Sequence, residues 1–305
     1  MKNTANGAIA LLFVLLLTLA ARRSNADYNA NIIVDHEWLS QHRASIVLVD
    51  VRDQGPYWES HIAGAINIPV NDLQTKPDAI LLPIKQLEKI LGSKGLDVDK
   101  EVVLYGKGGE MAYLEFWMFD YLGMKRVHVL DGGMEEWSEQ TSKSASELSP
   151  AVFKASPDPK KYATTEYIKA RLKKPGSIIL DARTPAEYKG TDVRSLRGGH
   201  IPGAININYK ENFIADSTKL KSLDELAKIY SKLDKKKEII VYCQTGTRAA
   251  NTYTVLKELG FRRVRNYDAS WIVWGTRQDL PVEDVSYINF FSIIQAIRKL
   301  EEEIK

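Results

Sequence analysis

The feature that most constrains the fold is an internal repeat, because the second half of this 305-residue chain echoes the first. The segment Glu101–Gly106 (EVVLYG) matches Glu238–Cys243 (EIIVYC) at an offset of 137 residues. The segment His61–Asn67 (HIAGAIN) matches His200–Asn206 (HIPGAIN) at an offset of 139. Domains commonly hold about 150 residues, so the length also fits two of them. The sequence therefore predicts a duplicated domain.

Each copy alternates short β-branched runs with helical patterns. The predicted strands are Ile46–Val51, Glu101–Tyr105, Val127–Leu130, Ile178–Asp181, Glu238–Tyr242 and Val264–Tyr267. Such alternation predicts α/β domains, each with a mostly parallel sheet flanked by helices. Ligands of these sheets bind beyond the carboxyl ends of the strands.

The domain boundaries follow from composition. We expect the first domain over residues 27–140 and the second over 164–285, joined by an exposed linker at 141–163 that is rich in Ser, Lys and Pro. Residues 286–305 are predicted to form a C-terminal helix. Its apolar stripe comprises Tyr287, Ile288, Phe291, Ile294, Ile297 and Leu300. Docking on the second domain is favoured over a partner-binding or membrane-surface role.

The N-terminus is typical of a secretory signal. Lys2 precedes the apolar run Ala8–Ala21, and small residues follow at Ser24–Ala26, so residues 1–26 are predicted to be a signal peptide. The protein is then exported, to a periplasm in the simplest case, although an uncleaved membrane anchor is the alternative. Removing this segment takes away three of the 42 basic residues and none of the 39 acidic ones, which leaves a formally neutral chain with no electrostatic case for binding nucleic acid.

Cys243 is the only cysteine, and it directly follows a predicted strand. The polar run Gln244–Arg248 comes next, and Ala249–Leu259 has helical composition closed by Gly260. Backbone N–H groups in such a loop, with the start of a helix, stabilise a thiolate or an anionic ligand. An inert buried cysteine is the alternative, but the polar loop with a glycine favours a reactive thiol. The first copy has Gly106 at the matching position and cannot perform the same chemistry.

Four motifs follow one another in the second copy: Asp-x-Arg after a strand, His-Ile-x-Gly-Ala-Ile-Asn, Tyr-Cys-x-x-Gly-x-Arg, and Asp-x-Ser-Trp-x-x-Trp-Gly over Asp268–Gly275. This pattern, over about residues 30–283, resembles the tandem rhodanese family of thiosulfate sulfurtransferases. The resemblance implies an inactive first domain and a catalytic second domain. It also implies that the cysteine accepts a sulfane sulfur as a persulfide and passes it to a nucleophile, with ping-pong kinetics.

The resemblance assigns roles to the loop. Cys243 would be the nucleophile, and the N–H groups of its neighbours would surround the sulfur; these neighbours are Gln244, Thr245, Gly246, Thr247 and Arg248. Arg248 would neutralise the sulfite-like end of the donor. Asp181 would orient the loop by pairing with Arg183, which either reaches substrate or forms only a salt bridge at the sheet end. His200 lacks a second ligand at metal spacing, so no metal and no cofactor is expected.

The chain departs from the family pattern at one position. Some members place a second arginine where this sequence has Glu187, so Arg194 or Arg197 would have to supply a second cation. The loop also differs from the Cys-Gly-Ser-Gly-Val-Thr of mercaptopyruvate-specific relatives. We therefore expect a small anionic donor, thiosulfate or polysulfide, with cyanide or a thiol as acceptor.

Other functions remain open at this point. An exported sulfur carrier, which delivers sulfur to a protein acceptor, needs the same persulfide pocket as an enzyme. A cysteine phosphatase is disfavoured because its loop has one residue more than the four between Cys243 and Arg248. A redox-sensing thiol is disfavoured because no second cysteine is present to resolve a sulfenic acid.

Overall fold

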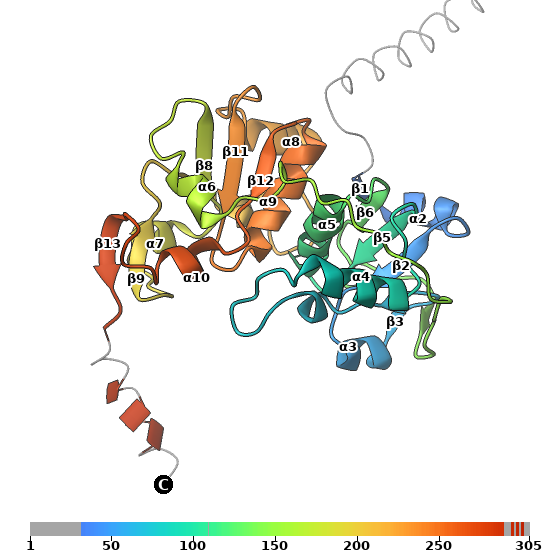
Figure 1. Cartoon of the computed structure of the whole chain (residues 1–305). Coiled ribbons are helices and arrows are strands. Elements are labelled where there is room, and N and C mark those ends of the chain that lie inside the picture. The colour runs from blue at the N-terminus through green and yellow to red at the C-terminus, as the bar shows by residue number, and fades with distance from the viewer. Residues whose placement is uncertain (1–31, 109, 290–293, 296, 299, 302–305) are drawn as a thin grey trace, which may run out of the picture.

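The computed structural model describes residues 32–289 except 109, together with 294–295, 297–298 and 300–301 (Figure 1). The predicted signal peptide at 1–26 lies outside the described residues. None of the helices formed by described residues has both the length and the apolar character of a membrane-spanning segment.

The first domain is an α/β unit around a five-stranded parallel sheet of order β1-β6-β5-β2-β4. Its elements in chain order are β1 (Ile33–Val34), α2 (His36–His42), β2 (Val47–Asp50), α3 (Gln54–Glu59), β3 (His61–Ile62), β4 (Ile66–Asn67), the 3-10 helix η1 (Val70–Leu73), α4 (Ile84–Ser93), β5 (Val102–Tyr105), α5 (Glu110–Leu122), β6 (Val127–Leu130) and β7 (Thr141–Ser142). The short strands β3 and β7 form a separate antiparallel pair.

The second domain repeats this plan with a four-stranded parallel sheet of order β10-β8-β11-β12. Its elements are α6 (Thr165–Lys169), β8 (Ser177–Asp181), α7 (Pro185–Tyr188), β9 (Arg197–His200), β10 (Ile205–Asn206), the 3-10 helix η2 (Tyr209–Asn212), α8 (Leu223–Ile229), β11 (Glu238–Tyr242), α9 (Thr247–Glu258), β12 (Val264–Asn266), α10 (Ser270–Trp274) and β13 (Glu283–Tyr287). The predicted fold class, two tandem domains with mostly parallel sheets flanked by helices, is confirmed.

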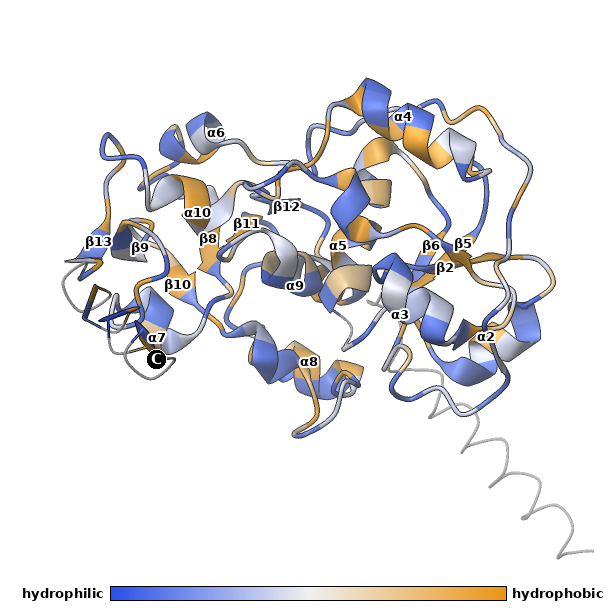
Figure 2. Ribbon diagram, turned by 90° about the horizontal axis from the view of Figure 1, so that it is seen from below, coloured by the Kyte–Doolittle hydropathy of each residue, from blue (hydrophilic) through white to orange (hydrophobic). Residues whose placement is uncertain are grey.

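The two domains share one hydrophobic core, centred on the equivalent helices α5 and α9. These helices lie side by side where the domains meet (Figures 1 and 2). Helix α5 is buried on nearly all sides, with Trp117 and Phe119 fully covered, and α9 buries Tyr253 and Leu256 in the same cluster. A helix that is apolar all round requires partners on every face, so the duplicated halves stabilise each other.

Reciprocal hydrogen bonds fasten the domains on both sides of this helix pair. Asp131 of the first domain accepts the backbone N–H of Leu220 in the second at 3.0 Å. Asp268, the matching residue, accepts the N–H of Leu81 in the first domain at 2.8 Å. Both carboxylates follow the last strand of their own parallel sheet, so each sheet end contributes one anchor to the opposite domain.

The expectation of an exposed linker is wrong in part. Residue Ala151 donates its N–H to Gly92 at 2.9 Å, and Ser156 donates to Leu122 at 2.9 Å, so the segment follows the surface of the first domain. The side chain of Phe153 is only 4% exposed and belongs to the shared core. A second aromatic side chain, Tyr162, stacks against Trp117 of α5. A stretch without helical or strand periodicity is therefore held in place by its backbone and by two aromatic side chains.

The predicted C-terminal helix over 286–305 is wrong at its start. Ser286 and Tyr287 belong to β13, which pairs antiparallel with β9. The Ser286 hydroxyl also donates to the carbonyl of Gly190 at 2.6 Å, and the pairing covers an edge of β9 that would otherwise be open. Farther on, the described residues are helical, but Ile294, Ile297 and Leu300 remain about half exposed instead of docking on the second domain.

The buried position of Phe153 leads to a stability prediction for the linker. Phe153→Ala should lower the free energy of unfolding by about 3 kcal/mol or more, since it leaves a cavity in the shared core. Urea unfolding followed by circular dichroism measures this change. The neighbouring Val152, which is 85% exposed, provides the control, and Val152→Ala should stay within about 0.5 kcal/mol of the parent. Equal effects of the two substitutions would contradict the anchoring role of Phe153.

Candidate active site

The loop that carries Cys243 connects the end of β11 to the start of α9. Gly246 caps α9 with φ of 86°, in the left-handed region where glycine is favoured. A Cβ at this position would also lie 3.0 Å from the carbonyl oxygen of Asp268. Both constraints require glycine here, and they let the chain turn from strand to helix within three residues after Cys243.

Helix α10 holds the beginning of this loop by three hydrogen bonds. The Cys243 N–H donates to the Ser270 hydroxyl at 3.1 Å, and the Cys243 carbonyl accepts the N–H of Trp271 at 3.0 Å. The carbonyl of Gln244 accepts the N–H of Ile272 at 2.9 Å. The position of the thiol is therefore set by the Asp268–Gly275 segment as well as by its own strand.

Ser270 is a site residue that the sequence reasoning missed. It has a φ of 45°, which is strained for a residue with a side chain. Gly133, at the matching position of the first copy, has a φ of 57° without this penalty. The repeat could have located this residue, because the second copy has a serine where the first copy has a glycine. The serine hydroxyl accepts the Cys243 N–H, which glycine cannot do.

The loop leaves several backbone donors available after Cys243. The N–H groups of Gln244, Thr245 and Gly246 donate to no other group among the described residues. The first turn of α9 leaves the N–H groups of Thr247 and Arg248 without an intrahelical acceptor. Cys243 itself is fully buried. A negative charge on its sulfur would therefore be stabilised mainly by these donors and by the helix start.

Arg248 forms a bidentate ion pair with Glu187, which the sequence reasoning did not foresee. Its Nη1 and Nη2 atoms donate to the two carboxylate oxygens at 2.7 and 2.8 Å. Glu187 is fully buried and is fixed from its other side by a capping box, in which it accepts the N–H of Thr184 and Thr184 accepts the N–H of Glu187. The signature Thr-Pro-Ala-Glu of that box could have located Glu187 in the sequence.

This ion pair shifts the pKa of both partners. Burial raises the pKa of Glu187, but the hydrogen bonds and charge of Arg248 outweigh it and hold the pKa at about 2. Burial lowers the pKa of Arg248, but its hydrogen bonds to Glu187 and a thiolate charge on Cys243 outweigh burial, so the pKa is raised. Both side chains are thus charged at neutral pH, and Arg248 lies near enough to Cys243 to interact with its charge.

The side chain of Gln244 fastens the loop to the segment before β9. Its Nε2 donates to the carbonyl of Arg194 and to the hydroxyl of Ser195, each at 3.1 Å. This contact brings Arg194 close to the site, where it lies 3.8 Å from Glu187 and is half exposed. Arg197 instead donates to carbonyl groups of the α10–β13 connection and is buried. Arg194 is the better placed of the two for a second cation.

Asp181 and Arg183 form a buried ion pair at the end of β8, with Nη2 and Oδ2 at 2.6 Å. The guanidinium of Arg183 also donates to the carbonyl of Gly199 and stacks 4.3 Å over the ring of Trp271. Arg183 is 1% exposed, and its guanidinium is occupied by contacts that stabilise the end of the sheet. They support the alternative in which Asp181 and Arg183 form only a salt bridge at the sheet end, and through Trp271 this pair also contacts α10.

The histidine at the sheet edge is part of the same framework. His200 stacks on Tyr188 with ring centroids 3.8 Å apart, and its Nδ1 contacts the carbonyl of Tyr188 at 3.0 Å. His61 and Tyr57 form the matching stack in the first domain. Among the described residues no group of His, Cys, Asp and Glu side chains has the arrangement of a metal site.

Asp268 is an unusual buried carboxylate next to the Cys243 loop. Its Oδ2 accepts the N–H of Leu81, while its Oδ1 has no partner among the described residues and lies next to Gly246. Burial raises its pKa to about 7, against a smaller opposing effect of the Leu81 hydrogen bond. The Asp268 carboxyl group therefore lies against the Cys243 loop and also bonds to the first domain. Its protonation state can affect both contacts.

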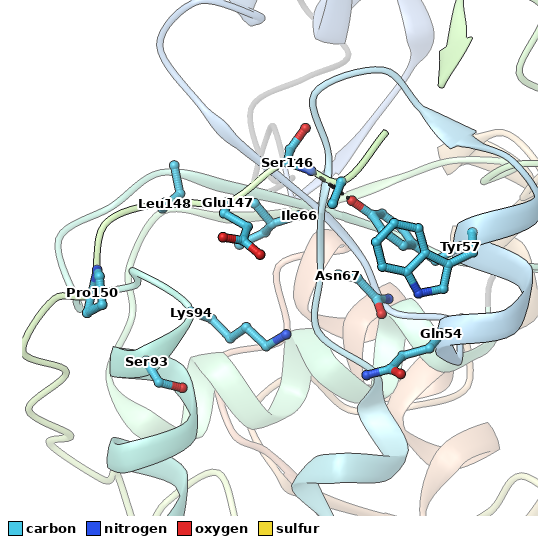
Figure 3. A pocket seen from close by; sticks show the side chains of 12 residues that line it. Gln54, Tyr57, Ile66, Asn67, Ser93, Lys94, Ser146, Glu147, Leu148 and Pro150 are labelled. Atoms are coloured by element: carbon cyan, nitrogen blue, oxygen red, sulfur yellow. Dashed lines mark hydrogen bonds between the residues drawn. The ribbon is translucent and has the colours of Figure 1, made fainter. Parts of the chain in front are cut away.

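The first domain has a separate pocket of about 380 Å³ that is distinct from the loop at Gly106. It lies beside α3, β4 and the linker, with Lys94 and Glu147 extending into it (Figure 3), and Trp58 is another of its lining residues. None of its lining residues belongs to the Cys243 loop.

Comparisons with known proteins agree with this geometry. A family model for the rhodanese-like domain matches residues 35–140 and 164–277. The chain is 34% identical to the thiosulfate sulfurtransferase of Azotobacter vinelandii over 249 residues, which cover 78% of this chain and 91% of that protein. The crystal structure of the Escherichia coli 3-mercaptopyruvate sulfotransferase is similar with a TM-score of 0.71 and 27% identity, covering 79% of this chain and 99% of that one.

A more distant structure shares the fold alone. The anaerobic ergothioneine biosynthesis enzyme of Chlorobium limicola superimposes with a TM-score of 0.77 at 23% identity, over 85% of this chain and 71% of that one.

Two rhodanese-like domains in one chain, with a cysteine loop in the second alone, define a tandem sulfurtransferase. The chain belongs to the rhodanese-like family, and it is an enzyme that transfers sulfur.

The Glu187–Arg248 pair predicts an acid-dependent contribution to stability. Glu187→Gln should lower the free energy of unfolding at neutral pH by about 3 kcal/mol, because it leaves Arg248 buried without its counter-charge. The folded pKa of about 2 lies below the ordinary 4.5. The contribution is therefore fully present above the ordinary value and is lost as the pH falls toward the folded one.

Melting temperatures of parent and Glu187→Gln protein, measured from neutral pH down to acid, test this. The gap should be constant above pH about 5 and should narrow below it. Asp192→Asn removes the exposed partner of Arg194 and serves as control, with a small effect at every pH. A gap that does not change in acid would show that Glu187 does not act through its charge.

The raised pKa of Asp268 predicts the opposite dependence on pH. The folded pKa of about 7 exceeds the ordinary 3.8, so the folded state holds the proton more tightly than the unfolded state between these values. The cost of the buried charge grows as the pH rises through this window and is complete above it. Asp268→Asn carries no such charge, and its melting temperature relative to the parent should rise from pH about 5 to pH about 8. A pH-independent difference would refute this.

Proposed function

We propose that this enzyme transfers the sulfane sulfur of thiosulfate, through a persulfide on Cys243, to cyanide or a thiol. The observation that carries the proposal is the placement of the only cysteine: it ends β11, precedes a run of free backbone donors and lies beside Arg248. An inert core cysteine needs none of these groups.

In the first half-reaction the Cys243 thiolate attacks the outer sulfur of thiosulfate. The bond between the two donor sulfurs breaks, and its electron pair leaves with sulfite while Cys243 becomes a persulfide anion. The two negative charges of thiosulfate leave as sulfite, so the charge on Cys243 is unchanged. Backbone donors of Gln244–Arg248 stabilise charge on the transferred sulfur, and the free N–H groups of Arg248 receive the sulfite-like end.

In the second half-reaction an acceptor attacks the outer sulfur of the persulfide. Cyanide forms thiocyanate, and the electron pair of the broken S–S bond returns to Cys243 as a thiolate. A thiolate acceptor leaves with the sulfur as its own persulfide in the same way. Sulfite therefore leaves before the acceptor reacts with the persulfide, and this order is the basis of ping-pong kinetics.

The choice of donor is supported by the shape and charge of the loop. Its relatives include proteins named thiosulfate sulfurtransferase and one named 3-mercaptopyruvate sulfotransferase. The loop ends in a guanidinium, and a second one, Arg194, lies at its edge. Each guanidinium keeps N–H groups that its carboxylate partners do not occupy, and these groups can donate to the oxygens at the sulfite-like end of thiosulfate.

We further propose that the protein is exported, with residues 1–26 as a signal peptide and a periplasm as the destination. The sequence supports this through Lys2, the apolar run Ala8–Ala21 and the small residues before Asp27. An anionic sulfur donor and a small acceptor can both be met in such a compartment.

The experiment that tests the proposed function is intact-mass spectrometry before and after thiosulfate, and again after cyanide. The parent should gain one sulfur atom and lose it to cyanide as thiocyanate, whereas Cys243→Ser should gain none. A parent that gains no sulfur from thiosulfate contradicts the proposed donor, with polysulfide and mercaptopyruvate as the next donors to test. A charged parent that resists both cyanide and thiols, and discharges only to a protein, would instead support an exported sulfur carrier.

A further inference from the structure

A hydrogen bond joins the first domain to the active site of the second. The Tyr209 hydroxyl donates to Glu110 Oε1 across the domain boundary at 2.6 Å. Tyr209 belongs to η2 of the second domain, and Glu110 is the first residue of α5 in the first. A phenol that donates to a carboxylate at this distance forms a strong, charge-assisted hydrogen bond. Residues 99 positions apart are thereby held together.

Tyr209 lies against the catalytic residues of the second domain. The guanidinium carbon of Arg248 is 5.8 Å from the centre of the Tyr209 ring. Burial, together with the Glu110 carboxylate and a thiolate charge on Cys243, raises the pKa of Tyr209, so the hydroxyl remains a neutral donor. Arg248 therefore has two neighbours that limit its position: the carboxylate of Glu187 and the ring of Tyr209.

Glu110 occupies a notable position in the repeat. It matches Thr247 of the catalytic loop at the offset of 137, so it belongs to the loop of the first domain that lost its nucleophile. With Gly108 it forms one side of a cleft of about 370 Å³, and Tyr209, Lys210 and Phe213 contribute to the other side. The first domain therefore supplies a charged side chain to a cleft at the domain boundary, and Tyr209 connects this cleft to Arg248.

We propose that Glu110 is a positioning residue of the donor site: it holds Tyr209, and Tyr209 keeps the guanidinium of Arg248 directed toward the anionic end of the sulfur donor. The inactive domain then contributes to donor use and not only to folding. This proposal rests on the proposed transfer of sulfur from thiosulfate through Cys243. It predicts that loss of the contact affects the donor half-reaction and spares the acceptor half-reaction.

Steady-state kinetics of Glu110→Gln, Tyr209→Phe and the double variant test the proposal. In a ping-pong reaction, kcat/KM for each substrate reports the half-reaction with that substrate alone. We expect kcat/KM for thiosulfate to fall about tenfold or more, the size of one lost hydrogen bond to a charged group, while kcat/KM for cyanide stays unchanged. Because Glu110 acts through Tyr209, the double variant should lose no more than Tyr209→Phe alone.

A matched control exists at the same interface. The Tyr253 hydroxyl donates to Asp120 Oδ2, also at 2.6 Å and also between the domains, and Asp120 belongs to the last turn of α5 instead of its start beside Tyr209. Tyr253→Phe should lower the melting temperature as Tyr209→Phe does and leave both kcat/KM values unchanged.

The outcomes separate this inference from the proposed function. If the parent does not gain sulfur from thiosulfate, the proposed function itself fails. If the parent gains sulfur, the inference is overturned by unchanged donor kinetics in both single variants. Parallel loss for both substrates, additive losses in the double variant, or an equal effect of Tyr253→Phe would also overturn it, because each indicates a general structural effect.

Discussion

The packing of α5 against α9 is the constraint on which the rest of the structure depends. Each helix begins immediately after the loop at the end of a central strand, β5 in the first domain and β11 in the second. Burying the apolar faces of both helices in one core fixes the two loops relative to each other. The start of α5 then lies within reach of Tyr209, and the start of α9 carries Arg248. The same hydrophobic contact that stabilises the duplicated chain thus assembles the site.

Comparison of the two copies distinguishes residues that both copies share from residues that occur only beside Cys243. The pair Asp181–Arg183 has a full counterpart in Asp50–Arg52, with the same 2.6 Å contact, in a domain without a nucleophile. A pair that persists without chemistry is structural.

The Glu187–Arg248 pair behaves differently, because the matching positions in the first copy are Pro56 and Met111. The first copy therefore lacks both the acidic and the basic member of the pair. This is expected for a buried pair, since one unpaired member would cost several kcal/mol. The ion pair and Cys243 therefore occur together, and only in the second copy.

Sequence reasoning succeeded where the information is local. The central strands were predicted within one or two residues, because β-branched runs between turns indicate them directly, and Cys243 was placed at a strand end for the same reason. The two-residue strands β1, β3, β4, β7 and β10 are too short to have a pattern. Partners distant in sequence were also missed: Glu187 is 61 residues from Arg248, and Glu110 is 99 from Tyr209. Only tertiary packing brings such residues together.

The charge balance of the site explains why the orientation of the Arg248 guanidinium matters more for donor binding than the net charge. Arg248 is already neutralised by Glu187, so its value to an anionic donor lies in N–H groups that Glu187 does not occupy. The direction of these N–H groups depends on the neighbours that fix the guanidinium plane, which are Glu187 and Tyr209. The uncompensated positive character beside Cys243 comes instead from free backbone N–H groups and the first turn of α9, which cannot move away from the sulfur. A fixed backbone can hold the transferred sulfur while a positioned side chain selects what delivers it.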